Sequence, residues 1–195
     1  MELSALTDSV NQCFAEQEQT AATAALLSRK IIRKTKNAIH SIHVDARNGA
    51  LFAALPSDLA ELTAAVQKYP PVRYSAAVQD AMMEVTEAVL FDRTVRGEPL
   101  PSYLELGVTP TAWVMGLGDS IGELRRVLLK DLMAGDTADA RRIFSAMDSM
   151  ADALLSFDVP DGIAPIRRKQ DIARGVIEKS RTDLTNALIA ARIKV

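Results

Sequence analysis

The chain has 195 residues, which is the size of one domain with a substantial hydrophobic core. Hydrophobic residues make up 48% of it and aromatic residues only 5%, a balance that favours helices packed through small and aliphatic side chains over a β-sandwich or barrel. The formal net charge of -2 excludes a globally basic nucleic-acid binder but allows a local basic patch. We therefore predict an all-α protein with a single domain spanning residues 1–195.

The first predicted helix is very long, because apolar residues recur at helical spacing from residue 4 to about 45 without Pro or Gly. Gly49 offers a place where this helix could end or bend. A second helix is predicted to start at Ser57, an N-cap residue ahead of acidic residues in the first turn, and to stop before Pro70 and Pro71. Four further helices follow, with a connector containing one short turn between the first two of them. Their predicted ranges are 74–96, 110–133, 137–157 and 166–193.

Cys13 is the only cysteine, so an intramolecular disulfide and a cysteine-rich zinc site are both excluded. The first twenty residues lack the basic and then apolar segments of a signal peptide, and no apolar run is long enough to span a membrane. These features predict a cytoplasmic protein that does not bind membranes.

Two predicted helices carry acidic pairs on their faces. Asp119 and Glu123 are four residues apart, and Glu84 and Glu87 are three apart, so each pair shares one side of its helix. No Lys or Arg lies three or four positions from Glu84 or Glu87. Like charges at these spacings destabilise an isolated helix by about 0.2–0.5 kcal/mol per pair. This repulsion must be offset by basic residues on another helix, by raised carboxyl pKa values, or by a cation.

Two helices that each offer two carboxylates can surround a divalent cation, and such hard oxygen ligands suit Mg²⁺ or Mn²⁺. The ferritin-like di-iron proteins need Glu-x-x-His, but the chain has only His40 and His43, without an acid at that offset. The helical nucleotide pyrophosphatases also begin from Glu-x-x-Glu, but their second pair is Glu-x-x-Asp rather than Asp-x-x-x-Glu. A metal-dependent nucleotide pyrophosphatase therefore stays as the less favoured alternative.

A basic stripe follows the first predicted helix at steps of three and four residues. It could contact the phosphates of a nucleic acid, although a solvated helix face has the same pattern. The stripe consists of Arg29, Arg33, Lys36, His40 and His43.

The combination of motifs resembles the translin and translin-associated factor X family. The resemblance runs from about Ser28 to Leu184 and rests on four segments: SRKIIRKTKNAIHSIH, MEVTEAVLF, WVMGLGDSIGELRR and IRRKQDIARGVIEKSRTDL. Trp113 stands where the family pattern leads us to expect a tyrosine. This mild substitution leaves the acidic motifs intact.

The resemblance implies an all-α fold of about seven helices, hollow oligomers that are commonly octamers, and binding of single-stranded RNA or DNA. In the factor X branch it also implies Mg²⁺-dependent endoribonuclease activity, with catalytic and metal-binding acids at the positions of Glu84, Glu87, Asp119 and Glu123. Prokaryotic-type members have one such protein, which implies a homo-oligomer. The alternative within the family is a non-catalytic, translin-like oligomer that binds RNA or DNA and uses these acids in salt bridges between helices.

Overall fold

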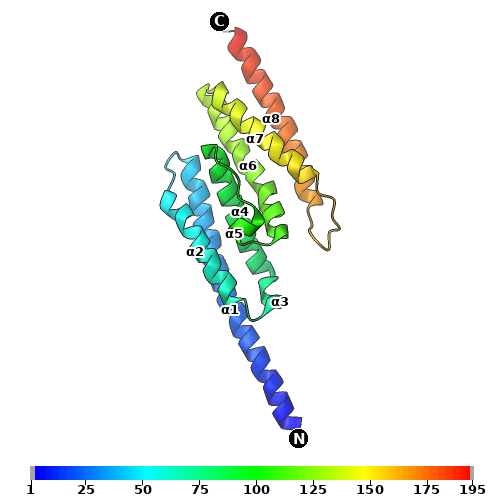
Figure 1. Cartoon of the computed structure of the whole chain (residues 1–195). Helices are drawn as coiled ribbons and strands as arrows, with labels where there is room; N and C mark the ends of the chain where they lie inside the picture. Colours follow the sequence, from blue (N-terminus) through cyan, green and yellow to red (C-terminus); the bar gives the residue numbers. More distant parts are fainter. Residues whose placement is uncertain (1–2, 194–195) are drawn as a thin grey trace.

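The computed structural model of the protein describes residues 3–193, and every regular element in that range is a helix (Figure 1). The very long first helix is confirmed at 41 residues. No helix among the described residues is both long enough and apolar enough to cross a membrane. The elements are α1 (Leu3–His43), α2 (Gly49–Ala65), α3 (Pro70–Arg73), α4 (Ala76–Arg96), α5 (Tyr103–Leu106), α6 (Pro110–Ala134), α7 (Thr137–Leu155) and α8 (Arg167–Ile193).

Helices α4 and α6 pack against each other at the centre of the molecule (Figure 1). Helices α1 and α2 cover α4 on one side, and α7 and α8 cover α6 on the other. Fully buried side chains of the two central helices, such as Phe91 on α4 and Ile121 on α6, lie in one continuous core. Each large aliphatic or aromatic side chain buried in this way contributes about 1.5–3 kcal/mol. The N-terminal part of α1 projects beyond the core (Figure 1).

The predicted ends of the four later helices lie within two residues of the observed ones. Local chemistry explains this agreement at α6, where the Thr109 side chain accepts a hydrogen bond from the Ala112 N–H and Pro110 occupies the first helical position. Gly97 and Gly135 end α4 and α6 with φ values of 68° and 77°, a conformation that glycine adopts without strain.

The predicted start of the second helix at Ser57 was wrong, because α2 begins at Gly49. The Asn48 side chain caps it by accepting a hydrogen bond from the Ala50 N–H. Pro56 lies inside this helix and removes one backbone hydrogen bond, but its side chain is exposed. Burial on both sides of the proline offsets that loss, through Phe52, Leu55, Leu59 and Leu62.

Gly49 was also expected to mark the end or a bend of the first helix, and this was wrong. Helix α1 ends at His43, and the turn that follows uses a positive φ of 56° at Asp45. The one-turn helix α3, which opens at Pro70, was not predicted; Pro is well suited to the first turn of a helix.

Candidate functional site

Helices α4 and α6 approach each other closely at Gly116. A Cβ atom placed on Gly116 would lie 2.6 Å from the carbonyl oxygen of Met83 and 2.9 Å from the backbone nitrogen of Glu87. The two backbones therefore nearly touch, which only a residue without a side chain allows. The crossing lies directly beside the acidic residues of both helices, so Gly116 sets the distance between the two pairs.

The structure brings all four predicted acids into one cluster. Burial raises the pKa of Glu87 to about 8, and the nearby carboxylates of Asp119, Glu84 and Glu123 add to this increase in that order. The Glu87 carboxylate forms no hydrogen bond or ion pair with any side chain described in the range 3–191. It is the least compensated acid of the cluster.

Glu84 is better supported than Glu87. The hydroxyl of Thr35, a fully buried residue of α1, donates a hydrogen bond of 3.3 Å to the Glu84 carboxylate. Burial raises the pKa of Glu84, while the positive charge of Lys36 and the Thr35 hydrogen bond work in the opposite direction. Helix α1 thus supplies both groups that stabilise the Glu84 carboxylate.

Glu123 has two nitrogen partners. Arg126 donates a hydrogen bond of 2.9 Å to it from the next turn of α6, and His43 bonds to the same carboxylate through Nε2. The His43 ring also packs against Phe91, with 5.2 Å between ring centroids, and its side chain is only 10% exposed. The structure therefore places His43 among the acids, apart from the exposed residues of the basic stripe.

Asp119 pairs with Lys169, which lies in the first turn of α8 and donates from Nζ to Oδ1. Sequence reasoning missed Lys169 as a member of this site. Nothing in the local pattern around Lys169 indicates the contact, because it depends on how α8 packs on α6, 50 residues away in the chain.

A hollow of about 250 Å³ opens beside the cluster. Since a water molecule takes up roughly 30 Å³ of liquid, the hollow has room for a cation with several waters. Both acidic and basic side chains line it. Its lining residues are Lys36, Ile39, His40, His43, Glu84, Glu87, Glu123 and Arg126.

The basic stripe on α1 lies next to this hollow. Arg29, Arg33, Lys36 and His40 are exposed, and none forms an ion pair within the described part of the chain. The neighbouring Lys30 and Lys34 differ, because both pair with Asp58 of α2. The four exposed residues of the stripe are therefore available to an anionic ligand.

The ligand chemistry of the cluster fits a hard divalent cation, since four carboxylates converge and Glu87 has no cationic partner bonded to it. In the side-chain arrangement described for residues 3–191, however, no three His, Cys, Asp or Glu side chains lie close enough together to hold a metal ion. Two of the carboxylates are bonded to basic side chains instead: Asp119 to Lys169, and Glu123 to His43 and Arg126. Protein cations occupy two of the four carboxylates.

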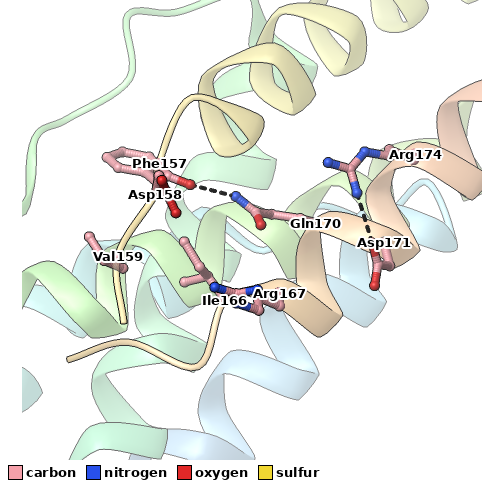
Figure 2. A pocket seen from close by; sticks show the side chains of 8 residues that line it. All are labelled: Phe157, Asp158, Val159, Ile166, Arg167, Gln170, Asp171 and Arg174. Atoms are coloured by element: carbon pink, nitrogen blue, oxygen red, sulfur yellow. Dashed lines mark hydrogen bonds and ion pairs between the residues drawn. The ribbon is translucent and has the colours of Figure 1, made fainter. Parts of the chain in front are cut away.

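A second hollow, of about 260 Å³, lies where the end of α7 meets the start of α8 (Figure 2). Gln170 donates a hydrogen bond to the carbonyl oxygen of Phe157, and Arg174 pairs with Asp171 at 2.7 Å (Figure 2). Gln170 also donates to the carbonyl oxygen of Leu154. These groups satisfy one another, and no predicted site residue lines this hollow. The hydrogen bonds of Gln170 hold the start of α8 against the end of α7.

Comparison with solved structures gives matches along nearly the whole chain. The crystal structure of AfC3PO is 30% identical, with a TM-score of 0.83 over 94% of this chain and 97% of that one. The AfC3PO complex with duplex RNA is 29% identical, with a TM-score of 0.81 over 97% and 98% of the two chains. The structure of apo-NeC3PO, 21% identical with a TM-score of 0.80 over 93% and 96% of the two chains, supports the fold alone.

No family model matches the chain. An uncharacterized protein of Methanocaldococcus jannaschii is 37% identical over 86 residues, which is 44% of this chain and 39% of that relative. The similarity to that relative therefore covers well under half of its length.

These matches define an all-α protein of the C3PO type, with its acidic cluster at the crossing of the two central helices. The chain belongs to the translin and translin-associated factor X family, as its motifs indicated.

Proposed function

We propose that the protein is a Mg²⁺-dependent endoribonuclease that cleaves single-stranded RNA within a homo-oligomer. The observation that carries the proposal is the convergence of Glu84, Glu87, Asp119 and Glu123 beside a hollow whose rim carries the basic residues of α1. An RNA substrate is supported by the similarity to AfC3PO, whose solved complex contains duplex RNA.

The four carboxylates would hold one or two Mg²⁺ ions, with Mn²⁺ as a substitute. When bound, the metal activates water for attack on the phosphodiester and neutralises charge in the transition state. The chain's own contribution is the placement of the acids. Glu87 gives up its proton more reluctantly than an ordinary glutamate, so cation binding would be accompanied by release of that proton near neutral pH.

The basic stripe would bind the RNA backbone. Lys36 and His40 line the hollow that holds Glu84 and Glu87, and Arg29 and Arg33 continue along α1 away from it. A strand whose phosphates follow the stripe would therefore bring one phosphodiester to the acids.

Assembly is supported by the exposed N-terminal part of α1. All side chains from Leu3 to Ala15 are exposed, although apolar Leu6, Val10 and Phe14 lie among them. Apolar surface of this kind is usually covered by a partner. We propose that the partner is another copy of the chain and that the assembly is an octamer, the size that the resemblance to the family implies.

The direct test is cleavage of a labelled single-stranded RNA, with a duplex of the same sequence alongside. Wild type should cut with Mg²⁺ and should stop cutting in EDTA, and Glu84→Ala protein should be inactive while still binding RNA. Glu18→Ala, which removes an exposed acid far along α1, is the matched control and should cut like wild type. Metal-independent cutting, or normal activity of the Glu84 variant, would exclude the proposed chemistry.

One set of contacts favours a second candidate function. Because Asp119 pairs with Lys169 and Glu123 pairs with His43 and Arg126, the acids could serve only as salt bridges between helices. The protein would then be a non-catalytic oligomer that binds RNA or DNA. Wild-type protein that binds RNA tightly but never cuts it, with Mg²⁺ or Mn²⁺ present, would identify this function.

Reversing the charge of Arg33 and Lys36 to Glu should weaken RNA binding and make it less sensitive to salt. Each phosphate contact with a single strand contributes about 0.7 to the slope of log affinity against log salt, so losing two should reduce the slope by about 1.4. Titrations in EDTA at several salt concentrations measure this without cleavage. Arg168→Glu with Lys179→Glu makes the same charge change on exposed residues of α8 and serves as control. An equal loss in both proteins would remove the stripe from the RNA site.

A further inference from the structure

Lys169 reaches the acid cluster from the side opposite α1. Its Nζ donates to Oδ1 of Asp119, and the two side chains are 22% and 26% exposed, so the pair is accessible to ions from solvent. Lys169 is also close enough to Glu87 to lower its pKa. Its charge therefore acts on two of the four acids, one from each central helix.

The position of Lys169 is set by packing as well as by charge. A Cβ atom on Gly118 would lie 3.2 Å from the Lys169 Cβ and 3.5 Å from its Cδ. The aliphatic part of the Lys169 side chain therefore packs against the backbone of α6 at Gly118, one residue before Asp119. The next residue, Gln170, donates hydrogen bonds to the carbonyl oxygen of Leu154 and to that of Phe157, the second of which is drawn in Figure 2. The first turn of α8 is thus fixed with the lysine directed at the cluster.

The neighbouring cations in α8 do not share this arrangement. Arg167 and Arg168 are both exposed, and Arg167 lies 3.5 Å from exposed Asp161. In the described part of the chain Arg168 has no ion-pair partner. Of the three consecutive basic residues, Lys169 alone meets the site.

The basic side chains at the site also divide among the acids. Lys36 acts on Glu84, and His43 and Arg126 bond to Glu123. The cation bonded to Asp119 is Lys169. Without it, the carboxylate of Asp119 would lie near Glu84 and Glu87 with no bonded cation to offset the repulsion.

We infer that Lys169 is a positioning residue that acts as an internal counter-ion: its ammonium group holds Asp119 in the metal-free protein and must leave that carboxylate for a divalent cation to bind. This inference rests on the proposed function, because it assumes that Asp119 is a metal ligand. Lys169 and Mg²⁺ then compete for one carboxylate. The lysine stabilises the metal-free site and weakens the binding of the ion.

The test is calorimetric titration of MgCl₂ into the full-length protein without RNA, together with the melting temperature in EDTA. Lys169→Met keeps most of the stem and removes the charge. We expect it to bind Mg²⁺ about fivefold more tightly than wild type, the upper end of what a partly exposed ion pair contributes, and to melt at a lower temperature in EDTA. Lys169→Arg should stay closer to wild type in both measurements because it keeps the charge. Arg168→Met, with the same change in net charge, should bind Mg²⁺ like wild type.

The outcomes distinguish the counter-ion role of Lys169 from the proposed metal site itself. Equal Mg²⁺ affinity in wild type and Lys169→Met protein, or weaker binding by the variant, would overturn the counter-ion role and leave the metal site standing. If neither protein binds Mg²⁺ or Mn²⁺, the proposed function itself fails. Should Lys169→Met not fold, Lys169→Gln, which keeps a polar group at the position, is measured in its place with the same expectations.

Discussion

Replacing Glu87 by glutamine is expected to abolish RNA cleavage and, at the same time, to stabilise the metal-free protein at pH 8. Glutamine has the same shape but no charge, so it removes a carboxylate that burial and three neighbouring acids disfavour. A group retained at such a cost in stability is typical of a functional site. Loss of a metal ligand should reduce cleavage by more than about a hundredfold, the upper end of the loss seen when only an outer-shell partner is removed.

The gain in stability should depend on pH. The pKa of Glu87 rises from 4.5 in the unfolded chain to about 8 in the folded protein, so the folded state binds more protons between these values. The contribution of Glu87 to the free energy of unfolding of wild type is therefore constant below pH 4.5. It falls as the pH increases from 4.5 to 8 and changes no further above 8. Glutamine does not titrate. The variant should be more stable by about 2–4 kcal/mol at pH 8, after allowance for solvent screening, and nearly equal to wild type at pH 4.5.

Urea unfolding in EDTA at pH 4.5, 6 and 8 measures this difference. Glu18→Gln removes an exposed charge and should give no pH-dependent gain. Adding Mg²⁺ should stabilise wild type more than the Glu87 variant, because a ligand at a hundred times its Kd adds about 2.7 kcal/mol to the state that binds it. A Glu87→Gln protein that is less stable than wild type at pH 8 would contradict the described environment of this side chain.

The helices that position the site were predictable because their ends are determined locally. Thr109 followed by Pro110, and the glycines at 97 and 135, act on their own helix ends and need no tertiary partner. The start of α2 was not predictable in this way. Pro56 is a strong local signal against a helix, and burial of the apolar residues on either side of it outweighs that signal.

The acid cluster was predictable for a similar reason, since acids on one helix face without basic neighbours require a partner elsewhere. The identity of those partners was not, because it depends on which helices meet. Thr35 and His43 contribute through the packing of α1 on α4, and Lys169 through the packing of α8 on α6. His43 was grouped with the basic stripe because it continues the stripe's spacing, which does not reveal that its side chain turns toward Glu123.

Gly116 and Gly122 lie on the same helix, and replacing each by alanine should change stability in opposite directions. At Gly116 the added methyl group would meet backbone atoms of α4 at 2.6 and 2.9 Å, which forces the two central helices apart and should destabilise the protein by about 3 kcal/mol. At Gly122 nothing lies within 4 Å of the added atom, and the position is exposed. Alanine there should stabilise the helix by about 0.8 kcal/mol, because glycine is a poor helix former.

The same pair of variants also tests how the crossing supports the site. Moving α4 away from α6 separates Glu84 and Glu87 from Asp119 and Glu123, so Gly116→Ala protein should lose Mg²⁺ binding and cleavage under conditions where circular dichroism shows it to be helical. Gly122→Ala should retain both, since it leaves the crossing unchanged. Urea unfolding and Mg²⁺ titration of the two proteins in parallel give the comparison. If Gly116→Ala were as stable and as active as Gly122→Ala, the close approach of the two backbones could not be what brings the carboxylates together.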